Sequence, residues 1–322
     1  MKVFLTGIAG FIGSHVAERL LSRGDSIVGL DAFDETLYPA ALHERNVTDL
    51  RAATDDKENR FELVRGDLAD PTLVNALFDR HGFDAVVHLG ALAGVRPSLL
   101  QPLRYEHTNV RGTLVVLDAM RAYGVKRLAF ASSSSVYGTR SEVPFRETDS
   151  VGHPASPYAA SKRAGELFCD TYAQLYGLRV ASLRFFMVYG PRQRPEMAIS
   201  VFARHILEGT PLPFFGDGSS ARDYTYIDDT VDGVVAALDS TGSVSGHRIY
   251  NLGGSRTTSL AQLVELLEHA LGATASLDRR PPQPGDVPLT CADVTEAGRV
   301  LGYRPRVPIE EGIAKFCTWL HR

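Results

Sequence analysis

The stretch KVFLTGIAGFIG, residues 2–13, opens the chain and decides its fold. Its first five residues form an apolar run rich in β-formers, which predicts a buried strand. The run passes into three glycines, Gly7, Gly10 and Gly13, and beyond them apolar residues recur at helical spacing as far as Gly24. The sequence therefore predicts a strand, a tight glycine turn and a helix in direct succession.

A glycine turn between a strand and a helix is suited to binding a dinucleotide. Glycines allow a tight bend and the close approach of the backbone to a pyrophosphate, while the helix N-terminus supplies N–H groups and partial positive charge. The next predicted strand, residues 26–30, ends at Asp31. A carboxylate at that point binds the adenosine ribose hydroxyls and repels a 2′-phosphate, so the sequence favours NAD over NADP.

Strands and helices alternate over the first 180 or so residues, which predicts a parallel sheet with right-handed crossovers. The expected fold is a Rossmann-type doubly wound α/β domain over residues 1–184, to which residues 225–252 return. Residues 185–322 are expected to form a smaller, substrate-binding α/β domain. Further strands are expected at residues 61–65, 84–89, 127–131, 180–184, 247–252 and 274–279, and helices at 71–80, 102–123, 158–176, 230–238, 260–271, 296–301 and 310–321.

The composition is that of an ordinary globular protein: 322 residues, 44% hydrophobic and 22% charged. A net charge of −4 gives no general attraction for nucleic acid or an anionic membrane, and no run approaches the roughly 18–20 apolar residues of a membrane span. Cys169, Cys291 and Cys317 are scattered and odd in number, which favours a cytoplasmic location over a disulfide framework or a zinc site. His88 has no partner at metal spacing, so we expect a packed strand-end residue and no metal.

Tyr158 and Lys162 lie four residues apart, which places a phenol and an ammonium on one face of a predicted helix. Such a pair also occurs on ordinary surface helices. A neighbouring ammonium lowers the pKa of a phenol from about 10, and Tyr158 is then a proton acceptor near neutral pH. The serine run at residues 132–135 follows the strand predicted at 127–131, so its hydroxyls are expected to face the cofactor crevice.

The glycine turn, Asp31, the serine run and Tyr158-x-x-x-Lys162 stand in the order found in the extended short-chain dehydrogenase/reductase family. The chain resembles the nucleotide-sugar epimerase and dehydratase branch of that family over essentially its full length. The resemblance implies NAD held throughout turnover, Tyr158 as base and Lys162 at the nicotinamide ribose. It also implies a serine that hydrogen-bonds the substrate oxygen. Counting back from Tyr158 to the family's serine points to Ser133, and Ser134 and Ser135 remain open. The cofactor contacts expected are Gly7, Gly10, Phe11, Ile12, Gly13, Asp31, Asp67, Leu68, Leu89, Ala91, Tyr158, Lys162 and Phe185.

The stretch FFMVYGPRQRPEM, residues 185–197, resembles that of the UDP-glucuronate 4-epimerases and, less closely, that of the UDP-glucose epimerases. The resemblance implies that Arg194 holds the sugar carboxylate with support from Arg192, since guanidinium groups suit carboxylates. These epimerases usually have Thr where this chain has Met187. The full set of substrate contacts expected is Arg96, Ser133, Ser134, Ser135, Tyr158, Met187, Arg192, Arg194, Phe214 along the uracil, Arg222 and Arg280 at phosphate, and Asp286 at the uridine ribose.

The resemblance implies a UDP-sugar substrate and reversible conversion of UDP-glucuronate to UDP-galacturonate by transient oxidation at C4. Related 4,6-dehydratases place an Asp-Glu pair where this chain has serines, so dehydration is not expected. A UDP-glucuronate decarboxylase, a UDP-glucose 4-epimerase and a non-enzymatic NAD-sensing regulator remain alternatives. A homodimer is expected, through helices near residues 102–123 and 158–177. Asp228 and Asp229 are expected to cap the helix at 230–238 and not to bind a metal.

Overall fold

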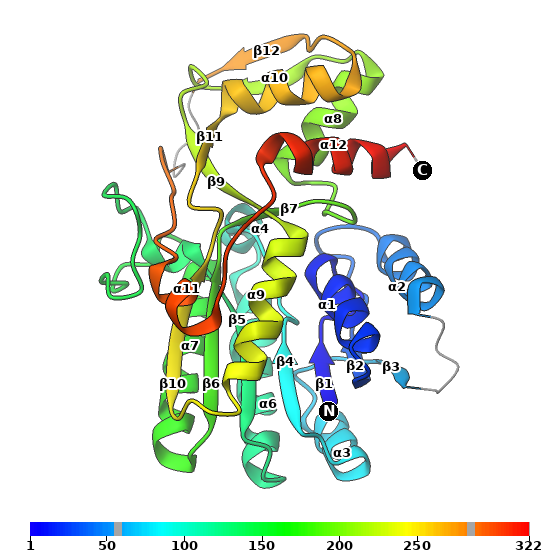
Figure 1. The fold of residues 1–322 in the computed structure, drawn as a ribbon, viewed down its shortest axis with the longest axis vertical. Helices are drawn as coiled ribbons and strands as arrows, with labels where there is room; N and C mark the ends of the chain where they lie inside the picture. The colour runs from blue at the N-terminus through cyan, green and yellow to red at the C-terminus, as the bar shows by residue number, and fades with distance from the viewer. Residues whose placement is uncertain (55–59, 282–286, 322) are drawn as a thin grey trace.

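The computed structural model describes residues 1–54, 60–281 and 287–321. Its centre is a parallel sheet of seven strands in the order β10-β6-β5-β4-β1-β2-β3 (Figure 1). The chain starts in the middle of this sheet, and strand order reverses between β1 and β4. The predicted Rossmann-type fold is confirmed, with residues 247–252 pairing beside β6. The strands are β1 (Lys2–Thr6), β2 (Ser26–Asp31), β3 (Phe61–Arg65), β4 (Ala85–His88), β5 (Arg127–Ser133), β6 (Arg179–Phe185) and β10 (His247–Leu252).

Helices cover both faces of the sheet because the strands are apolar on both sides. On β1, Val3 and Leu5 pack in one core cluster, while Phe4 between them packs in another. The first cluster includes residues of α1 (Phe11–Ser22) and α9 (Ile227–Ser240), and α2 (Ala40–Thr54) contacts α1. On the opposite face lie α3 (Pro71–His81), α6 (Gly112–Ala122) and α7 (Pro157–Tyr176).

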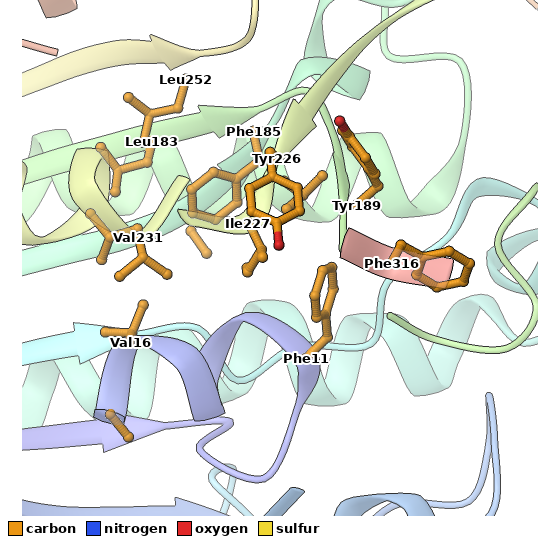
Figure 2. Packing of buried hydrophobic residues seen from close by; sticks show 14 of the residues in the cluster. Phe11, Val16, Leu183, Phe185, Tyr189, Tyr226, Ile227, Val231, Leu252 and Phe316 are labelled. Carbon is orange, nitrogen blue, oxygen red and sulfur yellow. The ribbon is translucent and has the colours of Figure 1, made fainter. Parts of the chain in front are cut away.

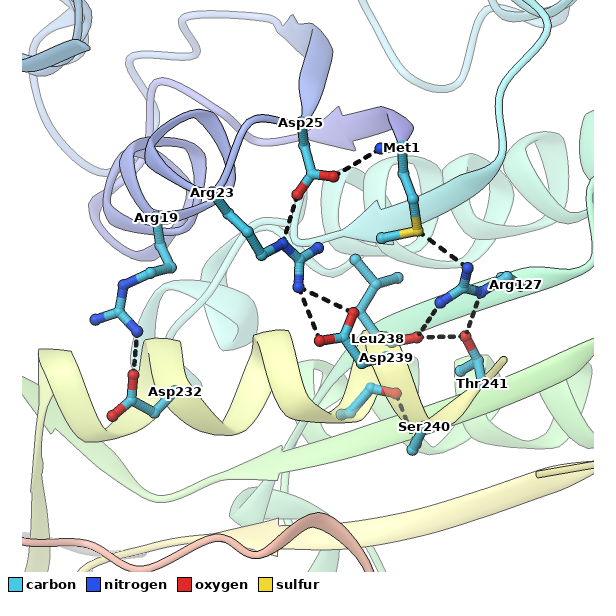
Figure 3. Close-up of polar contacts among 11 residues, drawn as sticks. Met1, Arg19, Arg23, Asp25, Arg127, Asp232, Leu238, Asp239, Ser240 and Thr241 are labelled. Atoms are coloured by element: carbon cyan, nitrogen blue, oxygen red, sulfur yellow. Dashed lines mark hydrogen bonds and ion pairs between the residues drawn. The ribbon is translucent and has the colours of Figure 1, made fainter. Parts of the chain in front are cut away.

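Apolar packing and ion pairs together hold α1 against α9. Val16 of α1 and Val231 of α9 are buried in the same cluster (Figure 2). Arg19 pairs with Asp232, and Arg23 reaches Asp239 at 2.8 Å (Figure 3). Exposed ion pairs contribute roughly 0–1 kcal/mol each, so most of the attachment comes from the apolar contact.

Most of the chain after β6 forms a second lobe beyond the carboxyl ends of the strands (Figure 1). It contains a three-stranded sheet, β11-β9-β7, and a two-stranded parallel sheet, β12-β8. No helix of the described residues is long and apolar enough to cross a membrane. The elements are β7 (Met187–Tyr189), α8 (Ala198–Glu208), β8 (Leu212–Phe215), β9 (Ala221–Tyr226), β11 (Thr257–Ser259), α10 (Leu260–Leu271), β12 (Leu277–Arg280) and α12 (Ile309–Leu320), while α11 (Thr295–Leu301) packs on α9 and β10.

The helix predicted at 102–123 is confirmed in extent: α5 (Pro102–Tyr105), a π-helical segment (Glu106–Arg111) and α6 follow one another without a break, and the short α4 (Val95–Leu100) precedes them. The π-helical segment inside this helix was not predicted. Within this segment, the Asn109 side-chain amide donates to the Leu92 carbonyl at 2.9 Å and accepts from the Leu92 N–H at 2.8 Å. A π-turn often marks a functional site, and this one lies beside the cavity described below.

The predicted cap of α9 is also wrong. The helix begins at Ile227, after Tyr226 in extended conformation, so Asp228 and Asp229 lie inside its first turn. The Asp229 carboxylate accepts the backbone N–H groups of Arg306 at 2.9 Å and Val307 at 3.1 Å. Through these two hydrogen bonds, Asp229 connects the loop at residues 306–307 to α9.

Candidate active site

A cavity of about 550 Å³ opens at the carboxyl ends of the central strands, around the point where strand order reverses. This is where open α/β sheets bind ligands, and the volume is typical of a small-molecule site. The structure brings together here every residue that the sequence suggested for the cofactor. These lining residues are Gly7, Gly10, Phe11, Ile12, Gly13, Asp31, Asp67, Leu68, Leu89, Ala91, Tyr158, Lys162 and Phe185.

The glycine turn has no room for side chains. A Cβ on Gly13 would lie 2.0 Å from the carbonyl oxygen of Gly7. Gly7 has φ +73°, and a Cβ there would lie 2.7 Å from the backbone nitrogen of Gly90. Gly10 caps α1 without a side-chain hydrogen bond, so the N–H groups of the first turn are left to a ligand at the cavity wall. The turn fits the pyrophosphate of a dinucleotide.

Asp31 lies at the end of β2 with little exposure. Its Oδ2 accepts the Ala9 N–H at 2.9 Å, and its Oδ1 accepts the Phe33 N–H at 2.8 Å. Burial raises the pKa of Asp31, while these two N–H groups and the nearby His43 oppose the rise. A carboxylate has about four acceptor positions, so Asp31 keeps capacity for ribose hydroxyls.

Tyr158 is positioned by the start of α7. The Ser156 hydroxyl caps this helix by accepting the Ala159 N–H at 3.1 Å, and Pro157 occupies its first position. Tyr158 thus stands in the first turn, where its phenol is hydrogen-bonded with Ser133. Of the three serines left open by the sequence, Ser133 lines the cavity; Ser134 is not among the lining residues, and neither is Ser135.

The prediction that Lys162 lowers the pKa of Tyr158 is wrong. The Lys162 Nζ donates to the carbonyl oxygen of Ala131 at 2.7 Å, so the ammonium is directed at β5. Burial raises the pKa of Tyr158, and the Ser133 hydrogen bond and the charge of Arg194 offset this only in part. Burial also lowers the pKa of Lys162 to about 8.

The loop that links β7 to α8 sends its two arginines in different directions. Arg194 lines the cavity, with its Nη1 3.2 Å from Glu196 Oε1. Arg192 does not line the cavity, because its guanidinium pairs with Glu18 of α1 at 2.5 Å. The predicted supporting role of Arg192 at the sugar carboxylate is therefore not found in the geometry.

Other predicted substrate residues lie outside this cavity. Met187 is half-buried in β7 beside Tyr224, although its neighbours Phe186 and Val188 line the cavity. Arg96 is exposed on α4. The remaining three belong to the second lobe: Phe214 is buried in β8, Arg222 lies on β9, and Arg280 on β12 pairs with Asp278. Asp286 lies outside the described residues.

Sequence reasoning missed several lining residues. Two of them, Tyr38 and His43, stack with ring centroids 4.5 Å apart in a segment without clear periodicity. His107 belongs to the π-turn, which the helical pattern did not reveal, and its Nε2 lies 2.9 Å from Asp67 Oδ2. The lining residues without a sequence prediction include Asp34, Leu37, Tyr38, His43, Arg104, His107, Thr108 and Met197.

Comparisons with known proteins agree with this site. The model of the NAD dependent epimerase/dehydratase family matches residues 3–253. UDP-glucuronate 4-epimerase 1 of Arabidopsis thaliana is 40% identical over 334 residues, covering 99% of this chain and 76% of that protein. UDP-glucuronate 4-epimerase of Thermodesulfobacterium geofontis is 39% identical over 316 residues, covering 98% of this chain and 94% of that protein.

A solved structure extends the similarity to three dimensions. The UDP-glucuronic acid 4-epimerase from Bacillus cereus, in complex with UDP-glucuronic acid and NAD, superposes with a TM-score of 0.90 at 34% identity. The match covers 100% of this chain and 99% of that one. Sequence, fold and cavity agree, and the chain belongs to the NAD dependent epimerase/dehydratase family.

Proposed function

We propose that the chain is an NAD-dependent isomerase that interconverts UDP-glucuronate and UDP-galacturonate at C4. One observation carries the proposal beyond family membership: Arg194 lines the same cavity as Tyr158 and Ser133. A proton acceptor, a hydroxyl partner and a guanidinium that suits a carboxylate thus converge on one site. The relatives that share this chain's length and fold support the same substrate.

The glycine turn and Asp31 would hold the dinucleotide, with Lys162 at its nicotinamide ribose. NAD, when bound, supplies the hydride acceptor and donor for C4 of the sugar. Tyr158 takes the proton of the C4 hydroxyl and returns it after the 4-keto sugar has rotated in the cavity. Ser133 holds the same substrate oxygen and, by its hydrogen bond, brings the phenol closer to ionisation.

Arg194 has a second task in this reaction. The 4-keto uronic acid is a β-keto acid and prone to lose CO₂, so an epimerase must keep the carboxylate out of alignment with the carbonyl. A guanidinium holds a carboxylate by a rigid pair of hydrogen bonds and fixes its plane. The chain has Ser133-Ser134-Ser135 where dehydratases carry an acidic pair, which speaks against elimination of water.

The test is to incubate the NAD-loaded protein with UDP-glucuronate and to identify the products by NMR. We expect UDP-galacturonate to accumulate to an equilibrium that is also reached from the other side. A UDP-pentose with release of CO₂ as the main product would replace the proposal with decarboxylation. Faster conversion of UDP-glucose than of UDP-glucuronate would identify a neutral-sugar epimerase.

We further propose that the protein works as a homodimer in the cytoplasm. The proposed dimer rests on exposed leucines along α4, α5 and α7, and its test is argued below. The cytoplasmic location rests on the cysteines, which are free in the structure and suit a reducing compartment. Fractionation of the producing cells, with the protein found outside the cytosolic fraction, would contradict it.

A further inference from the structure

Arg192 is almost fully buried and contacts two helices, although its side chain is charged. Its Nη2 donates to Glu18 Oε1 on α1 at 2.5 Å, and its Nε lies 3.7 Å from Asp49 Oδ2 on α2. The side chain is only 10% exposed. Its backbone has φ +63°, in the left-handed region that non-glycine residues rarely adopt. A residue keeps such a strained conformation only when the contacts around it stabilise it.

The two neighbours of Arg192 are also held in place, Pro191 by α1 and Gln193 by a hydrogen bond within the loop. The Pro191 carbonyl oxygen lies 3.0 Å from His15 Nε2 on α1. Gln193 is buried, and its Oε1 accepts the Gly190 N–H at 3.3 Å. A Cβ on Gly190 would lie only 2.6 Å from the Ile227 side chain of α9, so the loop packs closely against that helix.

The same loop continues directly into the cavity. Arg194, two residues after Arg192, lines the cavity, and its charge partly offsets the rise that burial causes in the pKa of Tyr158. Met197, at the end of the loop, lines it as well. The N-terminus of α1 forms the glycine-turn wall of that cavity, and His15 and Glu18 lie about one and two turns further along the same helix. Arg192 therefore links α1, which forms the cofactor side of the cavity, to the loop that forms its substrate side.

We infer that Arg192 is a positioning residue for Arg194: its ion pair with Glu18 fixes the loop at residues 190–197 so that the Arg194 guanidinium meets the sugar carboxylate. The inference rests on the proposed function for the identity of that carboxylate. Arg192 itself does not contact the substrate. Selectivity for a uronic acid over a neutral sugar thus depends on an ion pair that lies outside the cavity.

The experiment measures binding of UDP-glucuronate, UDP-glucose and UDP by calorimetry to NAD-loaded protein. All variants carry Tyr158→Phe, so that the sugar is not converted during the titration. Arg194→Met should weaken UDP-glucuronate at least about tenfold, because it removes the charged contact, and leave UDP-glucose within about twofold. Arg192→Met and Glu18→Gln should each reproduce this selective loss at about three- to tenfold.

The double variant Arg192→Met/Glu18→Gln should be no weaker than either single one, because both remove the same ion pair. Arg192→Lys should recover part of the selectivity, since it keeps a positive charge near Glu18. The matched control is Arg19→Met/Asp232→Asn, which breaks an ion pair between α1 and α9 without touching the loop. That control should bind all three ligands as the parent does.

Equal weakening of UDP-glucuronate, UDP-glucose and UDP by Arg192→Met would overturn the inference, as would unchanged binding. Additive effects of the two single variants would show that they act separately, and would also overturn it. NMR of the wild-type reaction tests the proposed function on its own. If Arg194→Met shows no selective loss, the carboxylate contact is wrong, and this inference fails with it.

Discussion

Tyr158 illustrates how a single side chain is tuned by opposing effects. Burial disfavours the phenolate, whereas the Ser133 hydrogen bond and the Arg194 charge favour it. The net result is a raised pKa, so the phenol is protonated at neutral pH in the protein alone. For Tyr158 to accept a proton, its phenolate must therefore be stabilised further by the groups that surround it once cofactor and substrate are bound.

The first prediction concerns this residue. Tyr158→Phe removes the proton acceptor and leaves the ring, so kcat should fall by about 10²–10⁴-fold while bound NAD is retained. Because the pKa is raised, kcat of the wild type should increase with pH through the neutral range. The checks are turnover and NAD content of the purified variant, together with a pH–rate profile. Unchanged turnover would remove Tyr158 from the role of base.

At the scale of an element, the glycine turn before α1 makes a steric prediction. Gly13→Ala places a Cβ against the Gly7 carbonyl oxygen, and the backbone must move to admit it. We expect a loss of about 1–3 kcal/mol in unfolding free energy and loss of tightly bound NAD. Denaturant unfolding and NAD content measure both. The control is Gly82→Ala at the end of α3: its Cβ meets no atom within 4 Å, but alanine is strained at φ +57°, so this variant should lose stability and yet keep NAD.

The end of β4 gives a third prediction, on the pH dependence of stability. His88 is buried between hydroxyls: Thr6 Oγ1 lies 2.6 Å from its Nδ1 and Thr113 Oγ1 lies 3.0 Å from its Nε2. Burial lowers the pKa of His88 to about 3. Below pH 6.5 the unfolded chain therefore takes up a proton that the folded chain does not, and stability falls.

Between pH 6.5 and pH 5 this should cost the wild type about 2 kcal/mol in unfolding free energy. His88→Gln keeps a donor and an acceptor but does not titrate, so its stability should fall by correspondingly less over that range. Urea unfolding at the two pH values measures the difference. An equal decline in both proteins would show that His88 does not stay neutral in the folded state. His15, whose pKa is lowered to about 4, is present in both and cancels in the comparison.

The elements also show how far sequence reasoning reaches. Apolar runs predict the inner strands of the central sheet, because buried parallel strands are apolar on both faces. The edge strands β3 and β10 are also predicted, although they are more polar and only partly buried. The π-helical segment inside the helix at 102–123 was not predicted, because its contact between Asn109 and Leu92 joins residues 17 positions apart and leaves no periodic pattern. Arg192 and Arg194 lie in one loop, and spacing alone does not tell which of them faces Glu18.

On the scale of the whole molecule, large apolar side chains remain exposed mainly along neighbouring helices. Leu100 and Leu103, on α4 and α5, are 83% and 82% exposed. Leu167 and Leu175 on α7 are also exposed, and α7 contacts both α4 and α5. Several large apolar side chains exposed on neighbouring helices suit an interaction surface. Of these helices, α5 and α7 fall within the two segments expected to form the interface of a homodimer, and α4 immediately precedes the first of them.

The last prediction follows from this surface. The wild type should behave as a dimer in light scattering coupled to gel filtration. Leu103→Asp/Leu167→Asp should yield a folded monomer, because each charge would be buried without a partner in the interface. The control is Leu207→Asp: this exposed leucine lies on α8, in the other lobe (Figure 1), and its variant should remain a dimer. Circular dichroism must show that both variants fold. A monomeric wild type would refute the proposed dimer, and a dimer that survives the paired substitution would place its interface elsewhere.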